Sequence, residues 1–281
     1  MVYSLGLKQQ AKRGCAVHFG APPGLKKGGH VATDPVCGET FREREAEVAD
    51  LYDGRVYFFC SREHREAFRA EPETYARNAV ANRLHIGVMG AASGRFSDRV
   101  RDKAFELGRA IGGRGAVLIT GAAPGLPHDS ARGAQQAGGL SVGISPALSL
   151  DEHKYVYESP DDAFDVMIYT GSGLMGREIV NIRSSDIVVI INGHSGTLGE
   201  FAIAYDEGKL IGVVEGSGGI ADSINVLLEA IDKETGAQIV HDSDPENLVD
   251  RLVEAYVEGH FRHPSVFEIN HRAGGRRVPK G

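Results

Sequence analysis

The chain has 281 residues, of which 42% are hydrophobic and 25% charged, so it is long enough for one large α/β domain together with a small module. Its formal net charge of −7 at pH 7 argues against a general nucleic-acid-binding protein, and its three cysteines do not make a disulfide framework but fit a reducing compartment. The sequence has no run of about twenty apolar residues and no hydrophobic signal core, so we expect a cytoplasmic protein without a membrane span.

Both ends of the chain carry basic residues in segments rich in glycine or proline. Residues 1–29 contain five lysines and arginines and no acid, and residues 261–281 include a second basic stretch. Neither segment has hydrophobic periodicity, which predicts flexible, solvated arms; a contact with RNA or with an acidic partner is the alternative. Cys15, in the first arm, is expected to be an exposed cysteine without a role.

Residues 30–80 contain cysteine and histidine in a pattern suited to a metal. Asp34-Pro35-Val36-Cys37-Gly38 is followed by Tyr57-Phe58-Phe59-Cys60-Ser61-Arg62-Glu63-His64, then by Phe68 and Pro72-Glu73-Thr74-Tyr75. This pattern resembles the YHS domain, a small treble-clef-like metal module in which the position of His64 is usually a cysteine. Cys60 and His64 would share one face if a helix starts at Ser61.

The resemblance implies that Cys37, Cys60 and His64 hold Zn²⁺ or another transition metal, with His30 or Asp34 as the fourth donor. Thiolate and imidazole are both good ligands for such ions. The alternative is a metal-free module with two buried thiols. A domain this small buries few apolar side chains, which favours a stabilising metal.

From residue 83 onward, apolar runs alternate with helical segments. A strand at 84–90 is expected to lead through the turn 91–94 into a helix over 97–111, and a strand at 116–120 to lead through the loop 121–127 into a helix over 130–137. Further strands are expected at 141–145, 166–169, 186–191, 210–214 and 238–241, and further helices at 221–232 and 245–258. This alternation over about two hundred residues predicts a doubly wound parallel sheet, a Rossmann-like α/β fold.

The segment Asn192-Gly193-His194-Ser195-Gly196-Thr197-Leu198-Gly199-Glu200 is the most informative part of the sequence. It follows the β-branched strand 186–191, and the residues after it continue as a helix. Gly193 and Gly196 let the backbone approach a phosphate, Thr197 adds a hydroxyl donor, and the free N–H groups of the helix start supply partial positive charge. The alternative is an ordinary strand-to-helix turn with glycines for tightness.

Arg177 lies upstream, in the segment 176–186, which predicts a short amphipathic helix that runs into this strand. The arginine, the strand and the Gly-x-x-Gly-Thr-x-x-Glu loop together resemble the signature of the LOG-type, Rossmann-like nucleotide-binding family, formerly described as lysine decarboxylases. The motif of that family is Pro-Gly-Gly-x-Gly-Thr-x-x-Glu with an arginine upstream. The matching residues are Gly193, Gly196, Thr197 and Glu200, and Arg177 aligns with the family's arginine without a gap.

Family members that act as enzymes hydrolyse the N-glycosidic bond of nucleoside 5′-monophosphates, which implies roles for individual residues. Glu200 would stabilise the ribosyl cation and orient or deprotonate the attacking water, and Arg177 would contact the ligand and keep Glu200 ionised through its charge. The alternative for Arg177 is a cation on the helix surface that pairs with Glu178 or Asp186. The alternative for Glu200 is an acid in the first turn of a helix, where it interacts favourably with the helix dipole. The nucleotide is expected to lie against Gly193, His194, Ser195, Gly196 and Thr197, and against Gly90, Gly121 and Gly125 of the two preceding glycine-rich loops.

Three positions depart from the family motif. Asn192 replaces the proline, His194 replaces a glycine, and Gly199 replaces the acid that often precedes the final glutamate. The imidazole at position 194 either crowds the phosphate or donates a hydrogen bond to a phosphate of different placement, so binding without hydrolysis stays open. Relatives that resemble the segment Asn181-Ile182-Arg183-Ser184-Ser185-Asp186 include proteins regarded as molybdenum-cofactor carriers, so one alternative is a nucleotide or molybdenum-cofactor carrier or sensor. A separate alternative is a metal-handling protein that acts through the YHS-like module.

These interpretations divide the chain into four parts: a basic arm over 1–29, a YHS-like metal module over 30–80, a LOG-like nucleotide-binding domain over 83–260 and a basic tail over 261–281. The expected ligand is a nucleoside monophosphate or a related phosphorylated compound, whose hydrolysis needs no cofactor. The resemblance also implies a homodimer, because LOG-like domains usually pair through helices beside the active site.

Overall fold

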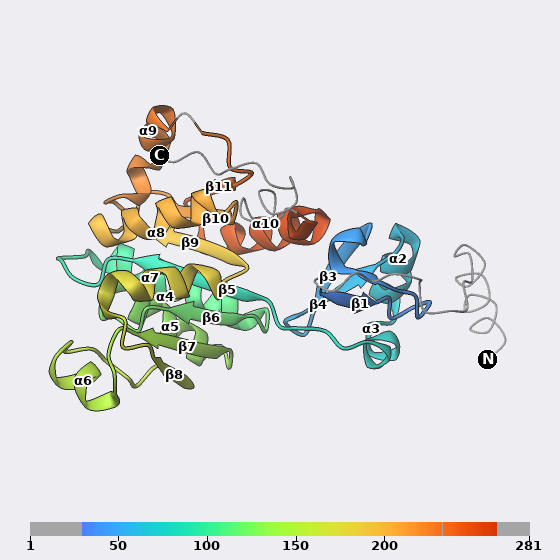
Figure 1. Cartoon of the computed structure of the whole chain (residues 1–281), viewed down its shortest axis with the longest axis horizontal. Helices are drawn as coiled ribbons and strands as arrows, with labels where there is room; N and C mark the ends of the chain where they lie inside the picture. The colour runs from blue at the N-terminus through green and yellow to red at the C-terminus, as the bar shows by residue number, and fades with distance from the viewer. Residues whose placement is uncertain (1–29, 232, 263–281) are drawn as a thin grey trace, which may run out of the picture. The chain divides into compact units, whose positions relative to one another are not determined.

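The computed structural model describes residues 30–231 and 233–262 (Figure 1). The predicted arm over 1–29, with Cys15, and the predicted tail beyond residue 262 lie outside these residues. The described chain forms two compact units, residues 30–82 with 257–262 and residues 83–256, and each is described by itself. None of the helices in the described ranges has both the length and the hydropathy needed to cross a bilayer.

The small unit contains two antiparallel strand pairs and several short helices. Strand β1 (Val31–Thr33) pairs with β2 (Thr40–Arg42), and β3 (Val48–Tyr52) pairs with β4 (Arg55–Phe59). Helix α2 (Arg62–Ala70) begins after its N-cap residue Ser61, as the sequence predicts, and the other short helices are η1 (Glu43–Glu45), α3 (Pro72–Tyr75), η2 (Ala76–Asn78) and η4 (His260–Arg262). The core is centred on Phe68, whose ring contacts Tyr52, Tyr57 and Phe59.

The large unit is built on a seven-stranded parallel sheet in the order β11-β10-β9-β5-β6-β7-β8. The strands are β5 (His85–Gly90), β6 (Val117–Thr120), β7 (Leu140–Ser145), β8 (Val166–Tyr169), β9 (Ile187–Ile191), β10 (Leu210–Val214) and β11 (Gln238–Asp242). Every residue of β9 and β10 is buried, as expected for strands covered on both faces. The predicted doubly wound α/β fold is confirmed.

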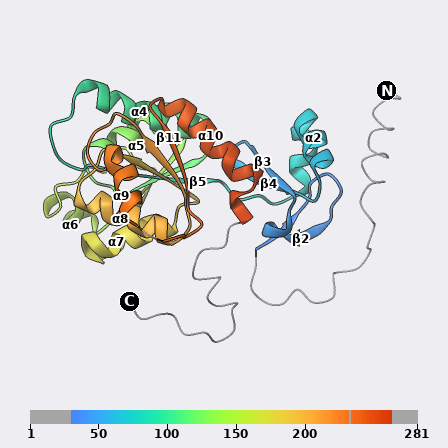
Figure 2. The same ribbon diagram turned by 90° about the horizontal axis from the view of Figure 1, so that it is seen from above.

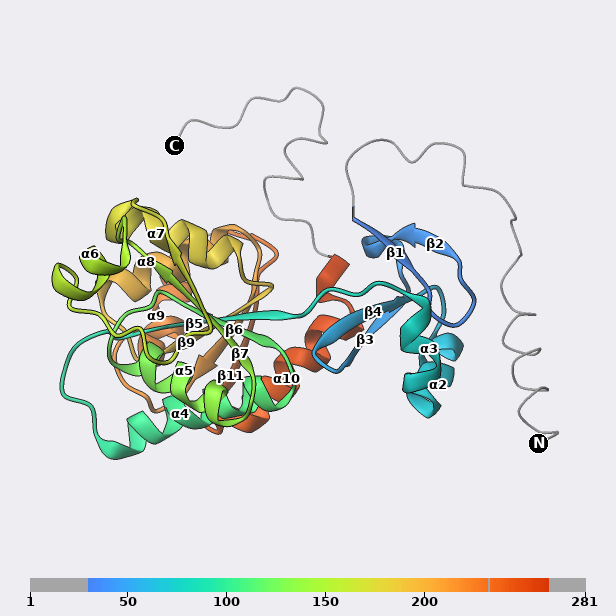
Figure 3. The ribbon, with the colours of Figure 1, turned by 90° about the horizontal axis from the view of Figure 1, so that it is seen from below.

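Helices cover both faces of this sheet. On one face lie α4 (Asp98–Gly113), α5 (Leu126–Gln136) and α10 (Pro245–Glu258), and on the other lie α7 (Gly173–Arg183) and α8 (Ser195–Asp206) (Figures 2 and 3). Helices α4 and α5 pack backbone against backbone, since a Cβ at Gly108 would lie 1.7 Å from the Ser130 carbonyl oxygen and a Cβ at Gly133 would lie 1.9 Å from that of Phe105. Glycine at these positions therefore permits the close approach.

The strand order reverses between β5 and β9. From β5 the chain proceeds outward through β6, β7 and β8, and it then returns to β9 on the other side of β5. In open parallel sheets, ligands bind outside the carboxyl ends of the strands at such a switch point. The loop after β5 and the loop after β9 therefore frame the place where a ligand is expected.

Three helices differ from the sequence prediction. Helix α5 begins at Leu126, four residues before the predicted 130–137, with Pro127 in its first turn. The predicted helix 221–232 is divided into η3 (Ala221–Ser223) and α9 (Ile224–Ala230). The sequence pattern does not anticipate α6 (Leu150–Tyr155), although the Ser149 side chain accepts a hydrogen bond from the Glu152 N–H at 3.2 Å, an N-cap that the serine itself could have signalled.

Candidate functional site

A cavity of about 190 Å³ lies at the switch point of the large unit, and we call it the switch-point cavity. It is formed by the loops after β5 and β6, the start of α5, the first half of α7 and the start of α8. Its lining consists of residues 88–93, Gly121, Ala123, Pro127, Leu174, Arg177, Glu178, His194, Gly196, Thr197 and Glu200. Seven of the residues that the sequence singles out thus share one cavity: Gly90, Gly121, Arg177, His194, Gly196, Thr197 and Glu200.

The turn from β9 into α8 is fixed by Asn192 and Gly193. Asn192 has φ 54°; its N–H donates to Ser217 Oγ at 2.8 Å, and its side-chain amide donates to the Ser217 carbonyl oxygen at 2.6 Å. Gly193 has φ 104°, and a Cβ there would lie 2.5 Å from the Thr197 side chain, so the turn requires glycine. Hydrogen bonds thus hold the turn at Asn192, the position of the motif's proline.

Helix α8 begins at Ser195 with His194 as its N-cap residue, and the His194 side chain makes no capping hydrogen bond. The backbone N–H groups of the first turn therefore present partial positive charge at the switch point. His194 is exposed and lines the cavity with Gly196 and Thr197, whereas Gly193 and Ser195 lie outside the lining. This end of the helix suits an anionic group such as a phosphate.

Arg177 reaches the cavity from α7 across Gly121, which follows β6. A Cβ at Gly121 would lie 1.1 Å from Arg177 Nη1, so the glycine leaves the room that the guanidinium occupies. Arg177 is 8% exposed, and its buried Nε has no hydrogen-bond partner within the described chain. Burial lowers the pKa of Arg177, against the opposing effect of Glu200 and Glu178. A buried guanidinium nitrogen without a partner suits a ligand that accepts hydrogen bonds.

Glu200 projects into the cavity from α8 and is 6% exposed. Asn181 Nδ2 donates a long hydrogen bond to its Oε1 at 3.5 Å. Burial raises the pKa of Glu200 to about 7, while Arg177 lowers it and Glu178 raises it further. Arg177 thus favours the ionised form of Glu200, as expected, but the loss of hydration raises the pKa by more than the arginine lowers it. A carboxyl group of this kind exchanges a proton near neutral pH.

One acidic residue of the cavity was not predicted to line it. From the sequence, Glu178 is expected only as a partner of Arg177, but it lines the cavity itself. Burial raises the pKa of Glu178 against the opposing effect of Arg177.

Gly125, predicted to bind the nucleotide, lies outside the cavity lining. It has φ 77°, and a Cβ there would lie 2.6 Å from the Ala91 carbonyl oxygen. Its role is to pack the loop before α5 against the loop after β5.

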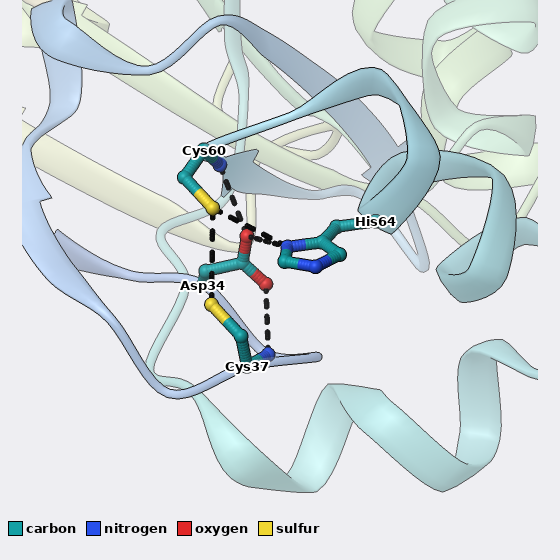
Figure 4. Close-up of side chains that lie close together, drawn as sticks. All are labelled: Asp34, Cys37, Cys60 and His64. Carbon is teal, nitrogen blue, oxygen red and sulfur yellow. Dashed lines mark hydrogen bonds and ion pairs between the residues drawn. The ribbon is translucent and has the colours of Figure 1, made fainter. Parts of the chain in front are cut away.

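The small unit holds a cluster of four potential metal ligands, Asp34, Cys37, Cys60 and His64 (Figure 4). Their donor atoms all lie within 4.8 Å of one another. The two Sγ atoms are 3.8 Å apart, and His64 Nδ1 lies 3.3 Å from Cys60 Sγ and 2.9 Å from Asp34 Oδ2. The predicted trio is brought together, and of the two proposed fourth donors it is Asp34 that joins it, whereas His30 is exposed and outside the cluster.

Asp34 also organises the loops that carry the thiols. Its Oδ1 accepts hydrogen bonds from the N–H groups of Val36 at 2.8 Å and Cys37 at 3.3 Å, and its Oδ2 accepts one from the Cys60 N–H at 3.0 Å. The carboxylate is fully buried, while both thiols are partly exposed. Two thiols, an imidazole and a carboxylate are a donor set that suits Zn²⁺ and related transition metals.

Comparison with known proteins agrees with this geometry. The model of the SLOG cluster4 family matches residues 83–249, which include all the elements around the switch-point cavity. The chain belongs to the SLOG cluster4 family. A second model, that of the YHS domain, matches residues 32–79 and thus the metal-ligand cluster. The Rossmann-like part of the predicted resemblance and the YHS resemblance are confirmed.

The large unit, which we call the SLOG unit, is also similar to individual proteins. An uncharacterised protein of Archaeoglobus fulgidus is 34% identical over 128 residues, which are 46% of this chain and 78% of that protein. The molybdenum cofactor binding protein of Rippkaea orientalis is 28% identical with a TM-score of 0.51, over 62% of this chain and 98% of that one. A structure of the molybdenum cofactor carrier protein of Chlamydomonas reinhardtii is 28% identical with a TM-score of 0.50, over 62% of this chain and 99% of that one.

Proposed function

We propose that the SLOG unit binds a nucleoside 5′-monophosphate in the switch-point cavity and hydrolyses its N-glycosidic bond to free base and ribose 5-phosphate. The observation that carries this proposal is Glu200, a buried carboxyl group with a pKa of about 7 beside Arg177 at the start of α8. A general base is most effective when its pKa lies near the working pH.

Recognition of the monophosphate is assigned to the start of α8 and to Arg177. The uncapped N–H groups of the first turn would bind the 5′-phosphate, with the Thr197 hydroxyl as a further donor. Arg177 would use its unpaired Nε for a phosphate or ribose oxygen. The volume of about 190 Å³ is below the roughly 300–1,000 Å³ of pockets for drug-sized ligands, which favours enclosure of the ribose phosphate alone with the base toward the open side.

The chemistry requires positive charge on the ribose to be stabilised as the C1′–N bond breaks. An ionised Glu200 close to C1′ would stabilise that charge and take the proton of the attacking water. Binding of the phosphate at α8 would hold C1′ over the carboxylate, so that binding energy contributes to positioning. His194, which is exposed at the cavity, would donate a hydrogen bond to the phosphate in place of the backbone contact that a glycine gives.

A screen of AMP, GMP, CMP, IMP and UMP, read by chromatography for free base and ribose 5-phosphate, tests the proposal. We expect at least one of them to be hydrolysed by the wild-type protein and not by Glu200→Ala. The matched control is Glu207→Gln, an acid of low exposure just after α8 that pairs with Arg183 at 2.7 Å and lies outside the cavity. Base release that persists in Glu200→Ala would refute the assignment.

A second candidate function is the binding of a pterin cofactor without turnover. It is favoured by the similarity to the two molybdenum cofactor proteins, which extends over almost their whole length. No base release from any monophosphate, together with retention of molybdenum cofactor by the purified chain, would support this candidate and refute hydrolysis.

For the small unit we propose a bound Zn²⁺ or other transition metal held by Asp34, Cys37, Cys60 and His64, because their potential ligand atoms lie within 4.8 Å of one another.

For the SLOG unit we propose a homodimer. The support is a row of exposed apolar side chains on α7, where Leu174 is 55%, Met175 74% and Ile179 41% exposed.

A further inference from the structure

A second carboxylate, that of Glu178, lies in the switch-point cavity and has no role in the scheme above. Glu178 follows Arg177 on α7 and is 6% exposed, the same fraction as Glu200. Its side chain extends toward α8, where its two carboxylate oxygens lie beside Gly196 and Gly199. The carboxylate therefore lies against the face of α8 that carries Gly196 and Gly199.

The two glycines leave space for this carboxylate. A Cβ at Gly196 would lie 3.3 Å from Glu178 Oε1 and a Cβ at Gly199 would lie 3.1 Å from Oε2; apart from α8 itself, no other described atom lies within 4 Å of either. Neither glycine has a positive φ, so the backbone does not require glycine there, and glycine weakens a helix relative to alanine. The Glu178 carboxylate is the feature that a side chain at either position would disturb.

The cavity holds more acidic side chains than permanently charged basic ones. Two carboxyl groups, Glu178 and Glu200, face one guanidinium, that of Arg177, and the remaining ionisable side chain of the lining is His194 at the start of α8. Burial raises the pKa of both carboxyl groups, and Arg177 lowers both. A negative charge on Glu178 resists the loss of a proton from Glu200 and so opposes the effect of the arginine.

We infer that Glu178 is a positioning residue for Glu200: its carboxylate, held in the space left by Gly196 and Gly199, keeps Glu200 basic in the presence of Arg177. The inference rests on the proposed function. In that step the water oxygen bonds to C1′, the C1′–N bond breaks with its electron pair passing to the base, and the base takes a proton from solvent. The proton of the water passes to Glu200, which accepts it more readily when it is more basic.

Glu178→Gln removes the charge with little change of shape. We expect the acidic limb of the profile of kcat against pH to move to lower pH, and kcat at pH 8 to fall about three- to tenfold. Glu178→Asp keeps the charge and should leave the limb near its wild-type position. A limb that does not move in Glu178→Gln, in a protein whose hydrolysis depends on Glu200, overturns the inference and leaves the proposed function intact.

The titration of Glu200 itself gives a readout that does not require turnover. In full-length protein labelled with ¹³C at the glutamate carboxyl groups, the Glu200 signal is identified by its loss in Glu200→Gln. We expect its titration midpoint to be lower in Glu178→Gln than in the wild-type protein, and an equal or higher midpoint overturns the inference. A wild-type protein that releases no base refutes the proposed function alone, so the two failures are distinguishable.

Gly199→Ala tests the space on α8. The added Cβ presses on Glu178 Oε2 and shifts the carboxylate without removing its charge, so we expect the Glu200 midpoint to fall by less than in Glu178→Gln. Gly113→Ala is the matched control, because Gly113 lies at the end of α4 and a Cβ there would meet nothing within 4 Å. It should leave the midpoint unchanged. A wild-type midpoint in Gly199→Ala would contradict the assigned role of this glycine.

Discussion

Glu200→Gln should change the way in which the stability of the SLOG unit depends on pH. Burial raises the pKa of Glu200 from its ordinary value of 4.5 to about 7, so the folded protein holds this proton more tightly than the unfolded chain does. The resulting stabilisation is complete below pH 4.5, declines as the pH rises toward 7, and is lost above that. Glutamine does not titrate, so the variant lacks this decline.

The magnitude follows from the size of the pKa displacement. One unit corresponds to about 1.4 kcal/mol, so the displacement from 4.5 to about 7 corresponds to about 3.5 kcal/mol in the free energy of unfolding. Glu200 is 6% exposed, so solvent screens little of this energy. In a domain of this size about 1 kcal/mol moves Tm by roughly 2–4 °C, which makes the expected change roughly 7–14 °C.

Unfolding is best followed by circular dichroism, because the chain contains no tryptophan. Guanidinium unfolding of the wild-type protein and of Glu200→Gln would be compared from pH 4.5 to pH 8, so that titrations common to both cancel. We expect the difference to grow by about 3 kcal/mol in favour of the variant over this range. A difference that does not change with pH would refute the reasoning.

Gly121→Ala should displace the Arg177 guanidinium, since the Cβ would lie 1.1 Å from Nη1. We expect it to reduce base release about 10²-fold or more, and Arg177→Ala to do the same; wild-type rates would contradict the placement of the arginine. Cys60→Ser should abolish binding of one Zn²⁺ per chain, measured by competition with a chromophoric chelator, whereas His64→Cys should retain it because thiolate is an equally good ligand. Met175→Glu should convert a dimer to a monomer in light scattering, because the charge would enter an apolar interface; an unchanged mass would place the interface elsewhere.

The fold was predictable because its strands carry a strong local signal. The run Ile187–Ile191 is apolar throughout, and such runs occur in strands that are buried on both faces. The glycines of the loops mark where the chain turns toward the carboxyl end of the sheet. Helix α6 was not anticipated, since its six residues are too few to show a period and only its capping serine signals it.

The candidate site was predictable where residues follow one another in sequence, and not where they meet across elements. The motif places Glu200 and Thr197 on one helix start, and the spacing of Cys60 and His64 places them close together at the start of α2. The contact of Glu178 with α8 joins residues about 20 positions apart, so only the fold reveals it. The raised pKa of Glu200 was not predicted, because a sequence shows the neighbouring charge of Arg177 but not the loss of water around the carboxyl group.

Release of free base under single-turnover conditions, with protein in excess over the preferred monophosphate, tests most directly whether Glu200 catalyses hydrolysis in the switch-point cavity. We predict that the wild-type protein releases one base per nucleotide and that Glu200→Gln does so about 10²- to 10⁴-fold more slowly while still binding the nucleotide. Equal rates in the two proteins would contradict the role of Glu200, and intact nucleotide with both would contradict hydrolysis itself.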